Sequence, residues 1–315
     1  MKIAEVLTPL SDHHLALAAQ IGCDEIVLRC PQGDLSALAV DVARVRDRGL
    51  NVSVVEGYLP MTQLKLRATG WEDDLRQMKQ LIALMGSLGV RILCYNFMPS
   101  GDWSRTKVPQ IERGGAVVTA FDLAQVDDPH PGQRVFIDEA RLWENLELFL
   151  AELLPWAEQH GVELSMHPDD PPLSPLFGYG RIMTSVAAFD RLLNLSASPA
   201  NKICFCQGNF KAMGADIPAT IRHFGDRINF VHFRDVAGTV PSFRETFHDN
   251  GPTNMAEAIR TYLDIGFTGP IRSDHVPMLD GETGEPGYTM QGRLFAVGYM
   301  RGLLQAAQDG PRQAL

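Results

Sequence analysis

The chain has 315 residues, of which 45% are hydrophobic and 21% are charged, and its formal net charge at pH 7 is −10. This composition is typical of a globular protein with a large core, and the negative charge argues against nucleic acid or an anionic membrane surface as the main partner. Because the five cysteines show no disulfide spacing and no signal peptide or bilayer-length apolar run is found, we expect a reduced, cytoplasmic, soluble protein.

Short apolar runs alternate with amphipathic stretches of helical length in the first half of the chain. The pattern predicts four strands, at 3–7, 25–29, 51–56 and 90–97. It predicts helices from about 11 or 12 toward Gly22, at 36–48, at 71–88 and at about 138–160. The polar segment between the fourth strand and the last of these helices has no clear periodicity. We expect an irregular lid or interface there, at about 107–137.

The second half repeats the alternation of strands and helices. Strands are predicted at 162–166, 202–206, 228–233 and 270–273, and helices at 184–195, 217–224, 255–265 and 291–308. Eight βα units with mostly short connections favour a single-domain (β/α)8 TIM barrel over residues 1–315, rather than a doubly wound sheet. No glycine-rich nucleotide motif opens any of the units, so nucleotide cofactors have no support.

Four residues of metal-ligand type lie at or near the ends of the last four predicted strands. They are His167, Cys206, His232 and Asp274. Functional residues of such barrels lie at the carboxyl ends of the strands, so these side chains could converge at the barrel mouth. Two imidazoles, a thiolate and a carboxylate form a complete ligand set for a divalent metal. Ligand softness alone suggests zinc, but it does not exclude Mn²⁺ or Fe²⁺.

Each of these residues also has a simpler interpretation. A single cysteine such as Cys206 is usually buried packing, and His232 could be a core histidine with satisfied hydrogen bonds. Asp274 and His275 could form a solvated turn. Coincident convergence of all four ligand types is much less probable, so we favour the metal site.

Other polar residues follow the late strands. Arg234 and Arg272 could bind a substrate carboxylate through their planar guanidinium groups, or could form structural ion pairs with Asp235 or Asp169. His248 could transfer protons or simply be exposed. Tyr288 could act as a base with a lowered pKa, or merely cap the barrel mouth.

Several segments of the chain resemble the mannonate dehydratases. The most specific are Cys94-Tyr95-Asn96-Phe97-Met98-Pro99 and His167-Pro168-Asp169-Asp170-Pro171-Pro172. Further matches are Cys206-Gln207-Gly208, His232-Phe233-Arg234, Arg272-Ser273-Asp274-His275 and Pro286-Gly287-Tyr288. The segments keep their order and cover most of the chain from residue 50 onward.

The resemblance implies a xylose isomerase-like barrel that binds Mn²⁺ (or Fe²⁺ or Co²⁺) through His167, Cys206, His232 and Asp274. It also implies loss of water from D-mannonate to give 2-keto-3-deoxy-D-gluconate. Tyr288 or His275 would then handle the C2 proton, and Asp274 and His248 are candidates for assisting the leaving hydroxyl. Asn96, Arg105, Arg234 and Arg272 are the expected substrate-binding residues, and we expect a homo-oligomer.

The chain departs from the family pattern around the expected metal ligands. The family usually has glycine where Val276 follows His275, and well-known members carry a long helical insertion after Thr106, which is much shorter here. These changes spare the ligand set but bear on the substrate, so a related aldonic acid is one alternative. A sugar isomerase or epimerase on the same barrel is another, and a non-catalytic sugar-acid-binding protein is a third.

Overall fold

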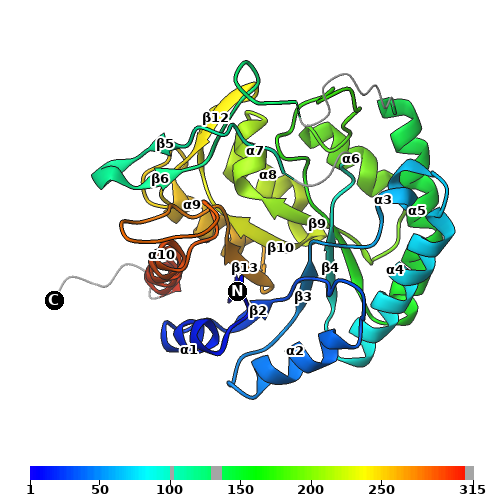
Figure 1. The fold of residues 1–315 in the computed structure, drawn as a ribbon, viewed down its shortest axis with the longest axis horizontal. Helices are drawn as coiled ribbons and strands as arrows, with labels where there is room; N and C mark the ends of the chain where they lie inside the picture. The colour runs from blue at the N-terminus through cyan, green and yellow to red at the C-terminus, as the bar shows by residue number, and fades with distance from the viewer. Residues whose placement is uncertain (100–102, 129–136, 309–315) are drawn as a thin grey trace.

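The computed structural model describes residues 1–99, 103–128 and 137–308. Its centre is a curved sheet of eight parallel strands, surrounded by helices (Figure 1). The strands are β1 (Lys2–Val6), β2 (Glu25–Val27), β3 (Val54–Glu56), β4 (Ile92–Tyr95), β8 (Glu163–Met166), β9 (Asn201–Cys206), β10 (Ile228–Phe233) and β13 (Pro270–Ser273). Their order in the sheet is β2-β1-β13-β10-β9-β8-β4-β3, so each strand lies beside its neighbour in the chain and the last pairs with the first.

The seam between β2 and β3 is closed by individual backbone contacts. Glu25 bridges Asn51, and Leu28 bridges Val55. The Leu28 N–H donates to the Val54 carbonyl at 3.0 Å, just beyond the end of β2. The predicted (β/α)8 barrel is therefore confirmed, with one side held by fewer hydrogen bonds than the others.

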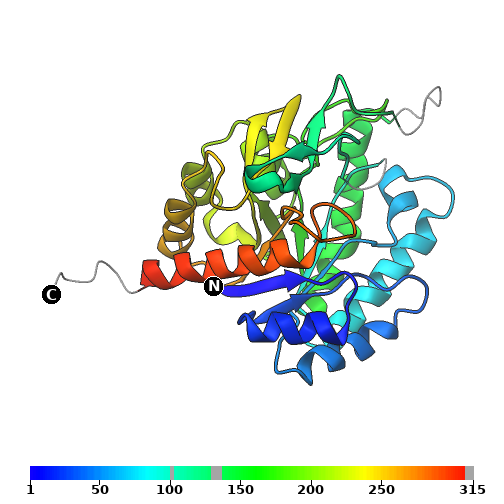
Figure 2. The ribbon, with the colours of Figure 1, turned by 60° about the vertical axis from the view of Figure 1, so that its left-hand side comes forward.

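The helices outside the barrel begin and end close to their predicted positions. They are α1 (Asp12–Gln20), α2 (Ala37–Arg46), α4 (Trp71–Ser87), α5 (Glu139–Gln159), α6 (Val186–Leu195), α8 (Ile217–Phe224), α9 (Met255–Asp264) and α10 (Met290–Gln308). Side-chain caps define several starts: Asp138 accepts from the Arg141 N–H, and Asp216 accepts from the Ala219 N–H. In Figure 2, α10 lies along β1, which brings the end of the described chain back to its beginning.

Two short helices, α3 (Thr62–Leu66) and α7 (Gln207–Ala212), were not predicted. Short strands were also not predicted: β5 (Gln110–Ile111), β6 (Val117–Val118), β7 (Ala120–Asp122), β11 (Val236–Thr239) and β12 (Ser242–Glu245). Single 3-10 turns lie at Arg113–Gly115 and Gly225–Arg227. β7, β12 and β11 form an antiparallel sheet, and β5 and β6 form an arm at the left of Figure 1. The segment expected to be irregular thus contains regular pairing, although 129–136 lie outside the described residues, and its function as a lid or interface stays a prediction.

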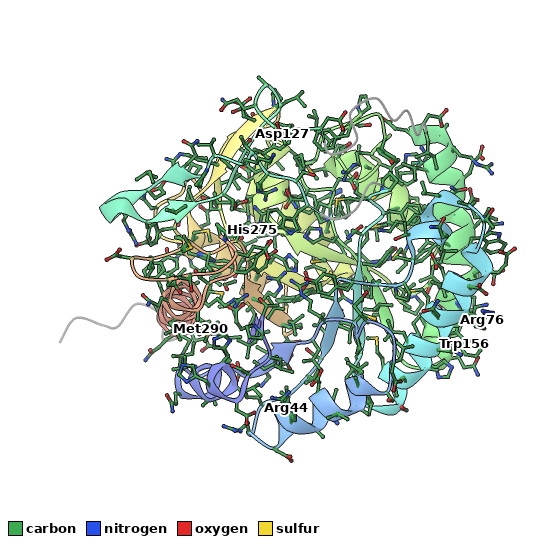
Figure 3. All side chains as sticks on the ribbon, in the orientation of Figure 1. Arg44, Arg76, Asp127, Trp156, His275 and Met290 are labelled. Atoms are coloured by element: carbon green, nitrogen blue, oxygen red, sulfur yellow. The ribbon has the colours of Figure 1, made fainter. Side chains whose placement is uncertain are left out.

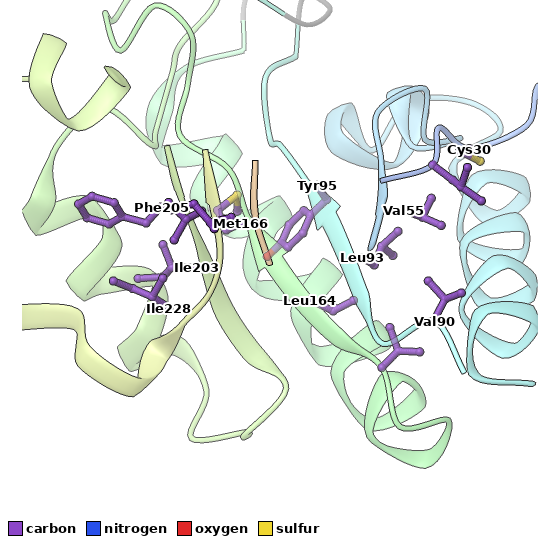
Figure 4. Close-up of a cluster of buried hydrophobic side chains, with 14 of the residues drawn as sticks. Cys30, Val55, Val90, Leu93, Tyr95, Leu164, Met166, Ile203, Phe205 and Ile228 are labelled. Carbon is purple, nitrogen blue, oxygen red and sulfur yellow. The ribbon is translucent and has the colours of Figure 1, made fainter. Parts of the chain in front are cut away.

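The main core fills the layer between strands and helices. Figure 4 shows Val55, Leu93 and Leu164 in this cluster, all fully buried. Alternate strand residues point inward and form a smaller apolar cluster inside the barrel: Ala4, Val6, Val27, Val54, Ile92, Cys94, Cys204 and Phe230. The polar residues of the site lie next to this cluster. None of the described helices is both long enough and apolar enough to cross a membrane.

Candidate metal centre and active site

Three of the four predicted metal ligands form a compact group. His167 follows β8, Cys206 ends β9 and His232 lies near the end of β10, and their ligand atoms all lie within 4.8 Å of one another. The grouping follows from the fold, because neighbouring parallel strands end at the same edge of a barrel.

Asp274, the first residue after β13, lies beside this group. Its Oδ2 is 4.0 Å from Cys206 Sγ and 3.7 Å from His232 Nδ1. Arg272 Nη1 donates to Asp274 Oδ1 at 3.0 Å, and Arg234 Nε lies 2.8 Å from Oδ2. The carboxylate is buried, but these guanidinium groups and the nearby imidazoles keep its pKa well below the usual range.

The electrostatics of the group favour a bound cation. Burial disfavours the Cys206 thiolate, but Arg234 and His167 outweigh burial and lower the pKa of this thiol to about 5. Burial also disfavours protonation of His167, yet the Cys206 thiolate raises its pKa. The pKa of His232 is raised by Glu56 and Asp274 despite burial and Arg272. Anionic neighbours thus draw protons onto both rings, and a divalent metal would replace those protons, so the donor set fits such an ion.

A cavity of about 340 Å³ opens over these residues. Seven of the predicted site residues line it: Asn96, His167, His232, Arg272, Asp274, His275 and Tyr288. His275 lies near the middle of the view in Figure 3, over the inner strands. Cys206, Arg105, Arg234 and His248 are not among the lining residues.

Arg105 and Arg234 bind carboxylates of the protein. Arg105 reaches Asp170 through two nitrogens, at 2.5 and 3.0 Å, and Glu245 at 2.7 Å. Arg234 donates to both oxygens of Glu245 at 2.8 Å and to Asp170 at 3.1 Å. The structural ion pairs considered for Arg234 therefore exist, with Asp170, Glu245 and Asp274 as partners rather than Asp235 or Asp169. Because both guanidinium groups are already paired and buried, they are poorly placed to receive a substrate.

His275 and Tyr288 face each other at the cavity, with ring centroids 5.4 Å apart. The His275 ring also meets Trp103 edge-on at 4.9 Å. Burial holds the pKa of His275 well below its ordinary value, even though Asp274 opposes this effect, so the ring is neutral. Burial, reinforced by the charge of Asp274, raises the pKa of Tyr288, so its phenol keeps its proton.

His248 is fully buried, and its pKa is lowered to about 4 by that burial. Neither ring nitrogen forms a hydrogen bond of good geometry, although the Phe233 backbone lies close enough to favour the protonated ring. His248 is not among the residues that line the cavity.

Three cavity residues received no role from the sequence. Glu56 ends β3 and receives two hydrogen bonds from Arg272, at 2.7 and 3.0 Å, while its Oε1 is 3.4 Å from His232 Nε2. Arg29 lies just beyond β2, and its Nε has no hydrogen-bond partner among the described residues. The strand-end rule that found His167 could have found both. Lys65 lies in the unpredicted α3 and donates to Asn96 Oδ1 at 2.8 Å, and no sequence signal pointed to it.

Fold and site together define the class: a xylose isomerase-like (β/α)8 barrel enzyme with metal-ligand residues at its mouth. A family model described as D-mannonate dehydratase (UxuA) matches residues 27–136 and 133–314. The chain belongs to the D-mannonate dehydratase family. Its enzymes are hydro-lyases and are generally metal-dependent.

Individual relatives agree with this assignment. "Mannonate dehydratase 2" of Halalkalibacterium halodurans is 34% identical over 308 residues, covering 89% of this chain and 88% of the relative. "Mannonate dehydratase" of Shouchella clausii is 34% identical over 304 residues, covering 84% and 85%. The crystal structure of mannonate dehydratase from Streptococcus suis serotype 2 superposes with a TM-score of 0.91 at 28% identity, covering 100% of this chain and 97% of that one. An L-ribulose 3-epimerase structure, at 15% identity and a TM-score of 0.64, shares the fold alone.

Proposed function

We propose that this protein removes water from D-mannonate to give 2-keto-3-deoxy-D-gluconate. The observation that carries the proposal is the group of His167, Cys206 and His232 beside a cavity that also presents Asp274, His275 and Tyr288. Family membership supports the same reaction. The small sugar acid would occupy the cavity, and a homo-oligomer remains our expectation for the working form.

We propose that His167, Cys206, His232 and Asp274 hold the metal, which would be Mn²⁺, Fe²⁺ or Co²⁺. When bound, such an ion supplies Lewis acidity that polarises substrate oxygens and stabilises negative charge. The lowered pKa of Asp274 leaves that carboxylate without a proton to donate, so its role is that of a ligand rather than an acid. His248 is outside the cavity wall, and a catalytic role for it has no support from its position.

The proton chemistry falls to His275 and Tyr288. The C2–H bond next to a carboxylate is weakly acidic, so its cleavage needs a neutral base near the substrate, and the neutral ring of His275 meets that need. The electron pair of this bond forms the C2–C3 double bond as the C3 hydroxyl departs. His275 would pass the proton taken from C2 to this hydroxyl, which then leaves as water. The resulting enol becomes the 2-keto acid. The Tyr288 phenol, which keeps its proton, would donate a hydrogen bond to a substrate oxygen.

The substrate carboxylate needs a cationic partner in the cavity. Arg272 lines the wall, but its guanidinium already bonds to Glu56 and Asp274. Arg29 also lines the wall. Its Nη1 donates to the Glu56 carbonyl at 3.3 Å and lies 3.7 Å from Glu56 Oε1, a longer ion pair than that of Arg272, and its Nε has no hydrogen-bond partner in the described residues. We therefore propose Arg29 as the main carboxylate-binding residue, with Asn96, another residue of the cavity wall, as a second contact.

The test is to incubate the purified protein with Mn²⁺ and a panel of aldonic acids, and to identify products by NMR. We expect 2-keto-3-deoxy-D-gluconate from D-mannonate and loss of bound Mn²⁺ in His167→Ala. An epimerised aldonic acid, formed without loss of water, would instead support the epimerase alternative. If no aldonic acid reacts and His167→Ala retains its Mn²⁺, both the reaction and the ligand set proposed here are wrong.

A further inference from the structure

A second group of metal-ligand side chains lies inside the barrel, beside the first. Cys94 of β4, Cys204 of β9 and His232 of β10 place their ligand atoms within 4.8 Å of one another, and all three residues are buried. Cys204 precedes Cys206 by two residues, so both thiols point to the same side of β9. The two groups thus occupy successive levels of the barrel and share one imidazole.

We propose that Cys94, Cys204 and His232 form a second metal site, selective for a thiophilic divalent ion such as Zn²⁺ or Cd²⁺. Two thiolates and one imidazole, with a fourth position open, are a known ligand set for zinc. Thiolate-rich sites select softer ions than the imidazole- and carboxylate-rich group that includes His167 and Asp274. Binding would release the two thiol protons to solvent, because both cysteines coordinate as thiolates.

The position of the group supports a site rather than simple packing. Cys94 lines the cavity wall although it is only 2% exposed, so an ion that enters the cavity meets this thiol directly. His232 Nε2 lies 3.4 Å from Glu56 Oε1 but forms no hydrogen bond there, which leaves a buried ring nitrogen that a metal ion could satisfy. Cys23 and Cys30 are also buried, but neither belongs to a ligand group among the described residues.

Sharing of His232 has a functional consequence. An ion in the second group would compete for this ring with an ion held by His167 and Cys206. A thiophilic ion would therefore weaken Mn²⁺ binding, and Mn²⁺ would weaken binding of the thiophilic ion. Inhibition of turnover by a thiophilic ion rests on the proposed function. Binding of that ion at the second group does not rest on it.

The test uses the reduced, metal-stripped chain and Cd²⁺, with no substrate present. In the variant Cys206→Ser, the thiol of the first group is gone. We expect the ultraviolet thiolate-to-Cd²⁺ charge-transfer band to remain and to saturate at one ion per chain. Adding Cys94→Ser or Cys204→Ser should remove at least half of the band amplitude. Adding Cys23→Ser is the matched control and should leave the amplitude unchanged.

A measurement on the unmodified chain covers the case in which a variant fails to fold. X-ray absorption of the protein with one equivalent of Cd²⁺ should count two sulfur ligands. A single sulfur would place the ion with Cys206 and overturn the proposal. The proposal would also be overturned if Cys206→Ser showed no band, or if only Cys23→Ser removed the band. Because these measurements involve no substrate, failure of the dehydratase proposal would leave them interpretable.

Discussion

Arg234 Nε lies 2.8 Å from Asp274 Oδ2, so the predicted metal ligand is ion-paired with the residue that follows the neighbouring strand β10. The same guanidinium also bonds to Glu245 and Asp170. Arg234 thus connects the candidate metal centre to β12 and to the loop after His167. A substitution that displaces Arg234 should therefore perturb the candidate metal centre without altering a predicted metal ligand.

Gly208→Ala should displace Arg234. A Cβ at position 208 would lie 2.5 Å from Arg234 Nη1, and the arginine is buried and paired on several sides, so it cannot simply swing away. We expect a loss of about 1–3 kcal/mol in the free energy of unfolding, which is typical of an overpacked interior, together with weaker Mn²⁺ binding. Urea unfolding and metal titration measure the two effects.

The matched control is Gly302→Ala in α10, where an added Cβ meets nothing within 4 Å. Alanine favours the helix by up to about 1 kcal/mol over glycine, so this variant should be as stable as the parent or more so. Equal effects of the two substitutions would show that position 208 has no special constraint.

Arg29→Met should weaken recognition of the substrate carboxylate. Charge-assisted hydrogen bonds contribute about 1.5–3 kcal/mol, so we expect kcat/KM for D-mannonate to fall about 10- to 100-fold. Arg44→Met, which removes a partly exposed arginine of α2 that does not line the cavity, should leave kcat/KM unchanged. If both variants match the parent, the carboxylate binds elsewhere.

His275→Gln and Tyr288→Phe should differ in severity. Loss of a general base costs about 10²–10⁴ in rate, so His275→Gln should reduce kcat by that order. Tyr288→Phe removes one neutral hydrogen bond, worth about 1 kcal/mol, and should reduce kcat about fivefold. Steady-state kinetics at saturating Mn²⁺ make the comparison. A larger effect of Tyr288→Phe would assign the base to the phenolate instead.

His248 should make stability depend on pH. Its pKa is about 4 in the folded protein, against an ordinary value of 6.5, because burial disfavours the charged ring. Between these values the unfolded chain binds a proton that the folded chain does not, so stability falls as pH drops from about 6.5 toward 4. A shift of this size corresponds to about 3 kcal/mol.

The variant that tests this linkage is His248→Leu, compared with the parent by urea unfolding across that pH window. The unfolding free energy of the parent minus that of the variant should fall as the pH drops through this window, because only the parent has the buried histidine. Parallel curves would mean that His248 does not carry the acid sensitivity.

The barrel and much of the site could be predicted from sequence because both depend on local patterns. Strand-end residues such as His167 and His232 share one edge of any parallel barrel, so order along the chain was enough to group them. The pairing of side chains across the site could not be predicted from sequence in the same way. Arg105 forms ion pairs with Asp170 and Glu245, which are 65 and 140 residues away in the chain. No local pattern indicates that its charge is already paired with carboxylates of the protein.

The short strands were not predicted for a related reason. β7 pairs with β12 although Phe121 and Phe243 are far apart in the chain, and strands of two to four residues are too short for an alternating pattern to be recognised. The role of Glu56 could have been found from its place at the end of β3. Its contact with His232 depends on the curvature of the barrel, which the sequence does not display.

Pairing of β1 with β13 also sets a time order during synthesis. Lys2 lies opposite Pro270, so β1 leaves the ribosome long before this second neighbour exists. Asp274 emerges at the same late stage, well after His167, Cys206 and His232. A nascent chain therefore exposes an unpaired β1 edge and an incomplete set of predicted ligands together. The step that pairs β13 with β1 is also the step that brings in the last predicted ligand.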